Sequence, residues 1–75
     1  MKIAITLMGA LREHAPIGNT LELAENETVR DLLTRLGIDE QRVQVVSVNK
    51  QFDHNRDRVL QDGDQIVVMP AVVGG

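Results

Sequence analysis

The chain has 75 residues, of which 43% are hydrophobic and 25% charged, and its formal net charge is -3 at pH 7. This length and composition are typical of one small globular domain that folds on a single core. Without cysteine, these residues can form no disulfide, no thiolate metal site and no cysteine nucleophile. Lysines and arginines are scattered and Trp and Tyr are missing, so we expect no nucleic-acid partner.

Membrane association is not expected either. No apolar run is long enough to cross a bilayer, and the first residues lack the apolar segment and cleavage site of a signal peptide. We therefore expect a cytoplasmic protein with no membrane partner. The two histidines, His14 and His54, are isolated in the sequence, which predicts surface positions for both and no metal site.

The first half of the chain predicts two strands and one helix. Apolar residues alternate along residues 2–8, which is the two-residue period of a strand with one buried face. Residues 9–15 can hold one helical turn, and residues 20–23 predict a second short strand. A helix is predicted between Thr28, a good N-cap residue, and Gly37, which ends it. Its apolar stripe consists of Val29, Leu32, Leu33 and Leu36.

Strands and turns alternate in the second half of the chain. Residues 44–48 predict a strand that ends in a turn at Asn49-Lys50. After a polar stretch, a short strand is expected at Val59-Leu60, and Asp62-Gly63 is a strong tight-turn pair. Residues 65–69 predict the last strand, which a proline terminates.

These elements predict an α+β fold in which one main helix packs on one face of a mixed sheet of about four to five strands. The first and last strands both alternate aliphatic residues, as expected for a paired centre of the sheet. This element order suits the β-grasp, or ubiquitin-like, roll. We expect the domain to span residues 1–70 and a flexible tail to span residues 71–75. A small β-sandwich is the alternative, which the clear helical stripe disfavours.

The last two residues, Gly74 and Gly75, allow two explanations. They can be an ordinary frayed end, where small residues are common. Alternatively, the lack of Cβ atoms lets a terminal carboxylate enter a narrow channel of another protein. A free carboxylate is a poor electrophile, so chemistry at Gly75 requires activation, most simply by adenylation with ATP.

Several motifs resemble the ubiquitin-like sulfur carriers, the family of the molybdopterin synthase small subunit and the thiamine-biosynthesis sulfur carrier. The resemblance covers the whole chain. It is carried by Leu11-Arg12-Glu13, Val48-Asn49, Leu60-x-Asp62-Gly63-Asp64-x-Ile66 and Met69-Pro70-Ala71-Val72-Val73-Gly74-Gly75. The longer first loop with Leu-Arg-Glu is more similar to the molybdopterin branch.

This resemblance implies a sulfur carrier for molybdenum cofactor biosynthesis. The Gly75 carboxylate would be adenylated by a ubiquitin-activating-type adenylyltransferase and converted to a thiocarboxylate with sulfur from a donor protein. As the small subunit of molybdopterin synthase, the carrier would insert its tail into the large subunit, with Gly74 providing clearance. No cofactor would be bound, ATP would be consumed by the activating partner, and the catalytic residues would lie on the partner subunit.

Strand alternation predicts a docking face for such partners. Met8 and Met69 are expected to point away from the core, and we group the single aromatic residue, Phe52, with them. The full set of predicted partner-binding residues is Met8, Phe52, Met69, Pro70, Val72 and Val73. The alternative is that these residues merely cap one end of the core.

Other functions stay open on the sequence alone. The family often has an aromatic pair where this chain has Leu7-Met8 and Val68-Met69, which leaves the identity of the partner less defined. The sulfur could instead serve thiamine thiazole, cysteine or transfer-RNA thiolation. A non-catalytic ubiquitin-like binding module or a protein modifier is an alternative of another class. Calcium binding at Asp53-x-Asn55-x-Asp57 is disfavoured, because Arg58 stands where the calcium loop requires glycine.

Overall fold

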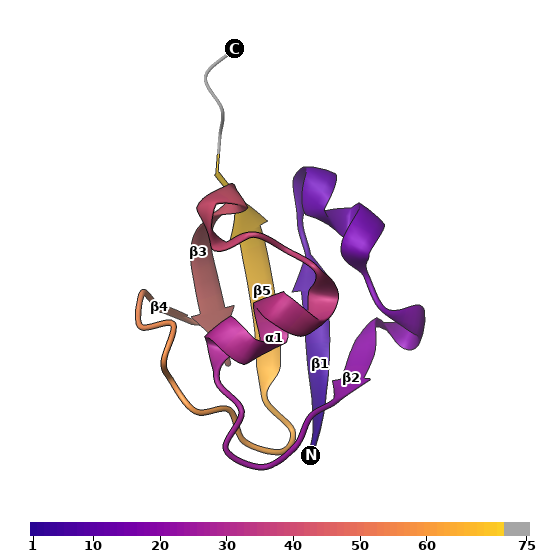
Figure 1. The fold of residues 1–75 in the computed structure, drawn as a ribbon, viewed down its shortest axis with the longest axis vertical. Coiled ribbons are helices and arrows are strands. Elements are labelled where there is room, and N and C mark those ends of the chain that lie inside the picture. Colours follow the sequence, from indigo (N-terminus) through magenta and orange to yellow (C-terminus); the bar gives the residue numbers. More distant parts are fainter. Residues whose placement is uncertain (72–75) are drawn as a thin grey trace.

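The computed structural model describes residues 1–71, which form a five-stranded sheet, one α-helix and three short 3-10 helices. The strands are β1 (Lys2–Leu7), β2 (Thr20–Glu22), β3 (Val43–Val48), β4 (Gln51–Asp53) and β5 (Gln65–Pro70). The helices are η1 (Gly9–His14), η2 (Ile17–Asn19), α1 (Val29–Leu36) and η3 (Glu40–Arg42). Figure 1 shows β1 and β5 in the centre of the sheet, whose strand order is β2-β1-β5-β3-β4.

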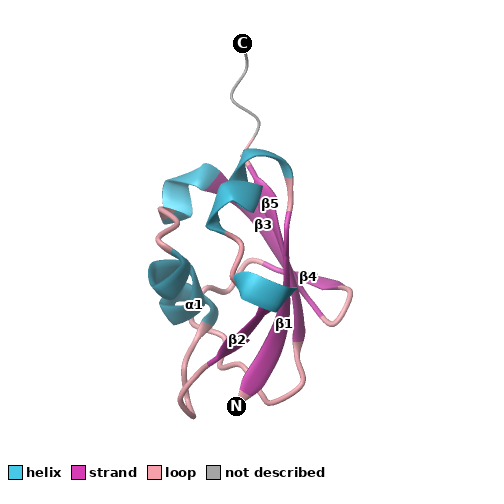
Figure 2. Cartoon of the chain, turned by 90° about the vertical axis from the view of Figure 1, so that its right-hand side faces the viewer, coloured by secondary structure: helices cyan, strands magenta, loops and turns pink. Residues whose placement is uncertain are grey.

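The sheet is mixed, because β1 and β5 run parallel whereas the other neighbouring strands run antiparallel. Helix α1 lies on one side of the sheet, and β4 bends away on the other side (Figure 2). This arrangement of one main helix on one face of a five-stranded mixed sheet confirms the predicted α+β, β-grasp fold.

Helix α1 begins and ends where the sequence predicts. The Thr28 side chain accepts the Asp31 backbone N–H at 3.2 Å, and the Asp31 carboxylate accepts the Thr28 N–H at 2.9 Å, which completes a capping box. Gly37 ends the helix with φ of 75°, a left-handed conformation that glycine adopts without strain. No helix within residues 1–71 is long and apolar enough to cross a membrane.

The core lies between α1 and the sheet. Val29, Leu32 and Leu33 of α1 are at most 1% exposed, and they cover the alternate side chains of the strands that face the helix. These strand residues are Ile3, Ile5, Leu7, Val46, Val48, Ile66 and Val68, all of them buried. Leu11 in η1 and Leu60 are also buried and extend the core beyond the sheet.

One predicted strand is wrong. At Val59-Leu60 only an isolated bridge forms, between Val59 and Thr28, and the short strand is instead β4 at Gln51–Asp53. The turn predicted at Asn49-Lys50 is confirmed, with φ of 52° and 71°. Two successive left-handed residues favour the two-residue hairpin turn whose twist matches the flanking strands, so the chain returns along β3 at once.

The polar loop after β4 is held by internal pairs. The Asp53 carboxylate accepts the Asn55 N–H at 2.8 Å and a hydrogen bond from Arg58 at 3.1 Å, and these two bonds lower the pKa of Asp53 below its ordinary value. Asp57 pairs with Arg30. Within residues 1–71, no group of three or more His, Cys, Asp or Glu side chains is arranged to hold a metal ion.

Candidate functional site

The face of the sheet opposite α1 carries a row of apolar side chains near the end of β5. Met69 pairs with Val45 across β3, and the Met8 N–H donates to the Val68 carbonyl at 3.0 Å, which extends β1 alongside β5. Since neighbouring residues of a strand point to opposite faces, Met8 and Met69 both point away from the buried Leu7 and Val68. Met8, Met69 and Val45 therefore lie side by side on the open face.

A second row crosses the sheet next to the first. Phe52 pairs with Ser47, and Ser47 pairs with Val67, so these three residues share the open face. Ser47 is buried between its neighbours, whereas Phe52 is 68% exposed. We call the apolar members of the two rows the open-face patch. It consists of Met8, Val45, Phe52, Val67 and Met69.

The open-face patch lies at the end of the sheet where β5 leaves the domain. After Pro70, the Ala71 N–H donates to the Arg42 carbonyl at 2.8 Å, which ties Ala71 to the end of η3. Gly9 lies against Pro70 on the other side, where a Cβ atom on Gly9 would stand 3.0 Å from Pro70 Cγ. The contact of Ala71 with Arg42 and the contact of Pro70 with Gly9 thus fix the end of the described chain beside the patch.

His14 supports this end of the domain and is not the free surface residue predicted from the sequence. Its Nδ1 lies 3.1 Å from the Leu36 carbonyl oxygen, and its Nε2 lies 3.2 Å from Nη1 of Arg42. Both ring nitrogens are therefore engaged in contacts that join η1, the end of α1 and η3. His54 is exposed, as predicted.

The structure brings together three of the predicted partner-binding residues, Met8, Phe52 and Met69. Pro70 does not join them, because it pairs with the buried Val43 and follows Met69, which places it on the other face of the sheet. The remaining predicted residues lie outside the described residues. They are Val72, Val73, Gly74 and Gly75.

Val45 and Val67 belong to the open-face patch but were not predicted from the sequence. Each is half-buried and next to an inward residue, so the period-2 rule that placed Met69 on the outside also applies to Val67. Val45 is harder to place, because the register shifts between Val43 and Val45 and interrupts the alternation of β3.

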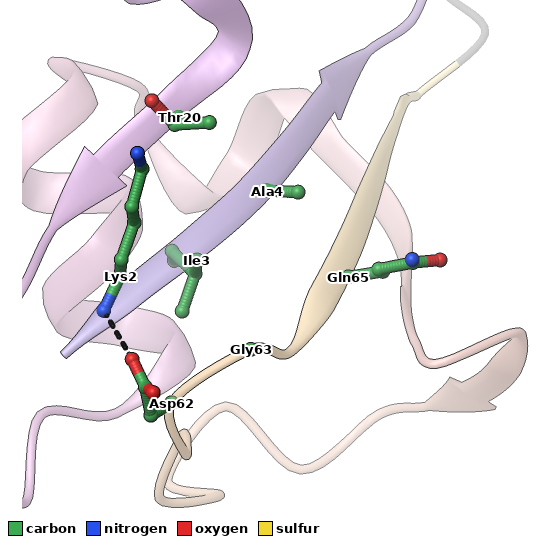
Figure 3. A pocket seen from close by; sticks show the side chains of 7 residues that line it. All are labelled: Lys2, Ile3, Ala4, Thr20, Asp62, Gly63 and Gln65. Carbon is green, nitrogen blue, oxygen red and sulfur yellow. Dashed lines mark hydrogen bonds between the residues drawn. The ribbon is translucent and has the colours of Figure 1, made fainter.

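A shallow hollow lies at the opposite end of the sheet (Figure 3). Its lining residues are Lys2, Ile3, Ala4, Thr20, Asp62, Gly63 and Gln65. Figure 3 shows the Asp62 carboxylate accepting the Lys2 backbone N–H, a bond of 2.7 Å, so this carboxylate ties the start of β1 to the turn before β5. Because β1 starts at Lys2 and runs parallel to β5, the hollow is separated from the open-face patch by the length of these strands.

Comparisons with known proteins agree with the fold. The model of the ThiS family matches residues 5–75. A putative molybdopterin converting factor, subunit 1, from Pyrococcus furiosus is 26% identical, with a TM-score of 0.73 over 96% of this chain and 99% of that one. The comparison with curated proteins found no match.

Two further solved structures share the fold. SAMP1 from Haloferax volcanii is 23% identical, with a TM-score of 0.69 and full coverage of both chains. A protein–protein complex of subunits 1 and 2 of the molybdopterin-converting factor from Helicobacter pylori contains a chain that is 24% identical, with a TM-score of 0.63 and full coverage of both chains. At this identity the two structures support the fold alone.

Proposed function

The chain belongs to the ThiS family, and we propose that this ubiquitin-like sulfur carrier acts as the small subunit of molybdopterin synthase. Support comes from the structure that is 26% identical over almost the full length of both chains, which is named a putative molybdopterin converting factor, subunit 1. The Leu11-Arg12-Glu13 motif after β1 agrees with that branch of the family.

In this proposal the reactive group is the Gly75 carboxylate. Adenylation by an activating partner joins the carboxylate to AMP and releases pyrophosphate from ATP. A sulfur nucleophile supplied by a donor protein then displaces AMP, so that one carboxylate oxygen is replaced by sulfur. Gly74 has no Cβ atom and fits a narrow channel of the partner.

The observation that carries the proposal is the position of the open-face patch beside the root of the tail. Phe52 is 68% exposed and Met8 is 45% exposed, and both belong to an apolar surface that continues to Met69 at the end of β5. An exposed apolar surface of this kind is typical of a protein interface. We propose that it docks on the large synthase subunit while the residues after Ala71 reach that subunit's active site.

The length of the tail is consistent with docking through the patch and delivery of the carboxylate by the residues after Ala71. Four residues follow Ala71 in the sequence, and an extended chain of that length spans at most about 14 Å. Docking through the patch would bring Ala71, where the tail begins, close to the partner, so a short segment suffices to deliver the carboxylate. The carrier would then supply substrate sulfur and the large subunit would supply the catalytic side chains.

Intact-mass spectrometry tests the proposed chemistry. The carrier is incubated with its activating enzyme, ATP and a sulfur donor, and we expect a mass gain equal to the exchange of one oxygen for one sulfur. Omission of ATP is the control, and it should leave the mass unchanged. An unchanged mass in the complete reaction, with an enzyme that is active on a known carrier, would overturn the proposal. The mass of the native protein also shows whether Gly75 is its last residue.

The acceptor is tested by capture on the immobilised carrier. We expect retention of the large subunit of molybdopterin synthase. Retention of a thiazole synthase or a tRNA-thiolating enzyme in its place would keep the carrier chemistry and exclude the molybdopterin assignment.

A further inference from the structure

The sulfur atoms of this chain are confined to three thioethers, because the sequence has three methionines and no cysteine. They differ in their surroundings. The Met1 side chain is 7% exposed and packs against the core, whereas Met8 is 45% exposed on the open-face patch. Met69 lies half-buried in the same row, paired with Val45. The most accessible thioether therefore lies on the surface that we assign to docking, at its β1 edge.

We propose that Met8 is a reversible oxidation site and that its oxidation to the sulfoxide prevents docking of the large subunit. This inference rests on the function proposed above. It concerns the free carrier, in which the open-face patch is uncovered and peroxide can reach the Met8 sulfur.

The chemistry requires one oxidant, hydrogen peroxide. The Met8 sulfur attacks one peroxide oxygen, the O–O bond breaks, and the second oxygen leaves as water after proton transfer. The sulfur loses two electrons and carries one added oxygen, and the peroxide is reduced. Methionine sulfoxide reductases reverse this step. Since the chain has no thiol, no cysteine of its own competes for the oxidant.

The position of Met8 predicts loss of docking without loss of the fold. A sulfoxide is polar, and burying it in an apolar interface without a hydrogen-bond partner is costly. The Met8 side chain points away from the core. The Met8 backbone makes two hydrogen bonds: its N–H donates to the Val68 carbonyl at 3.0 Å, and its carbonyl accepts the Leu11 N–H at 3.1 Å. Neither bond involves the thioether, so oxidation leaves both in place.

Met1 and Met69 provide internal comparisons. The Met1 side chain is shielded, and its terminal ammonium group donates to the Leu23 carbonyl at 2.7 Å at the other end of β1. Met69 is flanked by Met8 and Val45 on neighbouring strands, which limits access to its sulfur. The expected order of oxidation is therefore Met8 first, then Met69, and Met1 last.

The test compares the wild-type protein with Met8→Leu, a substitution that keeps the volume and the apolar character of the side chain. Both proteins are treated with hydrogen peroxide, the oxidised methionines are located by peptide mass mapping, and folding is checked by circular dichroism. Affinity for the purified large subunit of molybdopterin synthase is then measured before and after treatment. We expect treatment to weaken the binding of the wild-type protein about tenfold or more. Treated Met8→Leu should bind as tightly as untreated Met8→Leu. Methionine sulfoxide reductase should restore the affinity of the treated wild-type protein.

The outcomes separate this inference from the function on which it rests. If untreated wild-type protein does not bind the large subunit, the proposed function fails. If untreated protein binds and Met8 sulfoxide forms with no change in affinity, the inference is overturned. It is also overturned if Met1 is oxidised before Met8, if treated Met8→Leu loses as much affinity as the wild type, or if the loss coincides with unfolding.

Discussion

Asn49 Nδ2 donates a hydrogen bond to Asp64 Oδ1 at 2.9 Å, which joins the turn between β3 and β4 to the turn before β5. Two further hydrogen bonds strengthen the junction, because the Gln65 N–H donates to the side-chain oxygen Oδ1 of Asn49 and the Asn49 N–H donates to the Gln65 carbonyl. Asp64 accepts a further N–H from Gln61 and is 8% exposed. The Val48-Asn49 and Asp62-Gly63-Asp64 motifs thus act together in folding.

Replacing Asp64 with alanine should destabilise the domain without touching the open-face patch. The substitution removes the carboxylate that accepts hydrogen bonds from the side-chain amide of Asn49 and from the Gln61 N–H, and a hydrogen bond to a charged group contributes about 1.5–3 kcal/mol. Urea unfolding measures the loss in the free energy of unfolding. Glu25→Ala at an exposed position is the control and should stay within about 0.5 kcal/mol of the wild type. Equal stability of the two variants would contradict the role of the junction.

Replacing Phe52 with alanine should weaken docking without affecting the fold. The ring is 68% exposed in the free carrier, so its removal takes little from the core, whereas a large aromatic side chain is a typical anchor of an interface. We expect affinity for the large subunit to fall about tenfold or more. Isothermal titration calorimetry provides the measurement.

The matched control for Phe52 is Ile17→Ala. Ile17 is fully exposed, at 100%, but it belongs to η2, outside the open-face patch. Its truncation should leave affinity unchanged. Equal losses for the two variants would show that docking does not depend on the patch.

Deletion of Gly75 should abolish sulfur transfer and leave the thermal unfolding transition unchanged. The deletion moves the terminal carboxylate back by about 3.3–3.6 Å and leaves residues 1–71, which hold the whole described fold, unaltered. Thiocarboxylate formation and product formation by the synthase are the readouts. Gly75→Ala keeps the chain length and separates the effect of an added Cβ atom from the effect of reach. Full transfer by the deletion variant would contradict the assignment of Gly75.

The capping box of α1 predicts a pH-dependent contribution to stability. Hydrogen bonds to Asp31 from the Thr28 backbone and then from the Thr28 side chain lower the pKa of Asp31 below its ordinary value of 3.8. A carboxyl group whose pKa is lower in the folded state stabilises the fold above the unfolded value, and this stabilisation disappears as the pH falls through the folded-state pKa. The melting temperature of Asp31→Ala should therefore lie below that of the wild type at neutral pH and approach it in strong acid. A pH-independent difference would exclude this linkage.

The sequence predicts those parts of the fold in which local pattern and tertiary packing agree. Thr28 and Gly37 mark the ends of α1 by side-chain and backbone chemistry that acts within one helical turn. Strand β4 was not predicted from the sequence. It has only three residues, too few to show an alternating pattern, and its apolar side chain, Phe52, points to the open face instead of the core. The two left-handed residues before it, Asn49 and Lys50, were the signal that a returning strand follows.

The candidate site was predicted where alternation decides the direction of a side chain, and at Phe52, which stood out as the single aromatic residue. Met8 and Met69 follow residues that the core buries, so their outward position can be read from the sequence. Pro70 could not be assigned to a face without the pairing with Val43. The contact between Ala71 and the Arg42 carbonyl joins segments that are distant in the sequence, and no local pattern indicates it.

The central position of β5 has a consequence for truncated forms of the protein. This strand lies between β1 and β3, so a chain cut or halted before Gln65 lacks the middle of its sheet and leaves two strand edges without their partner. Such a fragment cannot complete its core, and unpaired strand edges and exposed apolar surface favour aggregation and degradation. Residues 71–75 follow directly after this strand, so every molecule that bears the tail also has the strand that its fold requires. A chain that ends before Gln65 therefore has neither the tail nor a complete sheet.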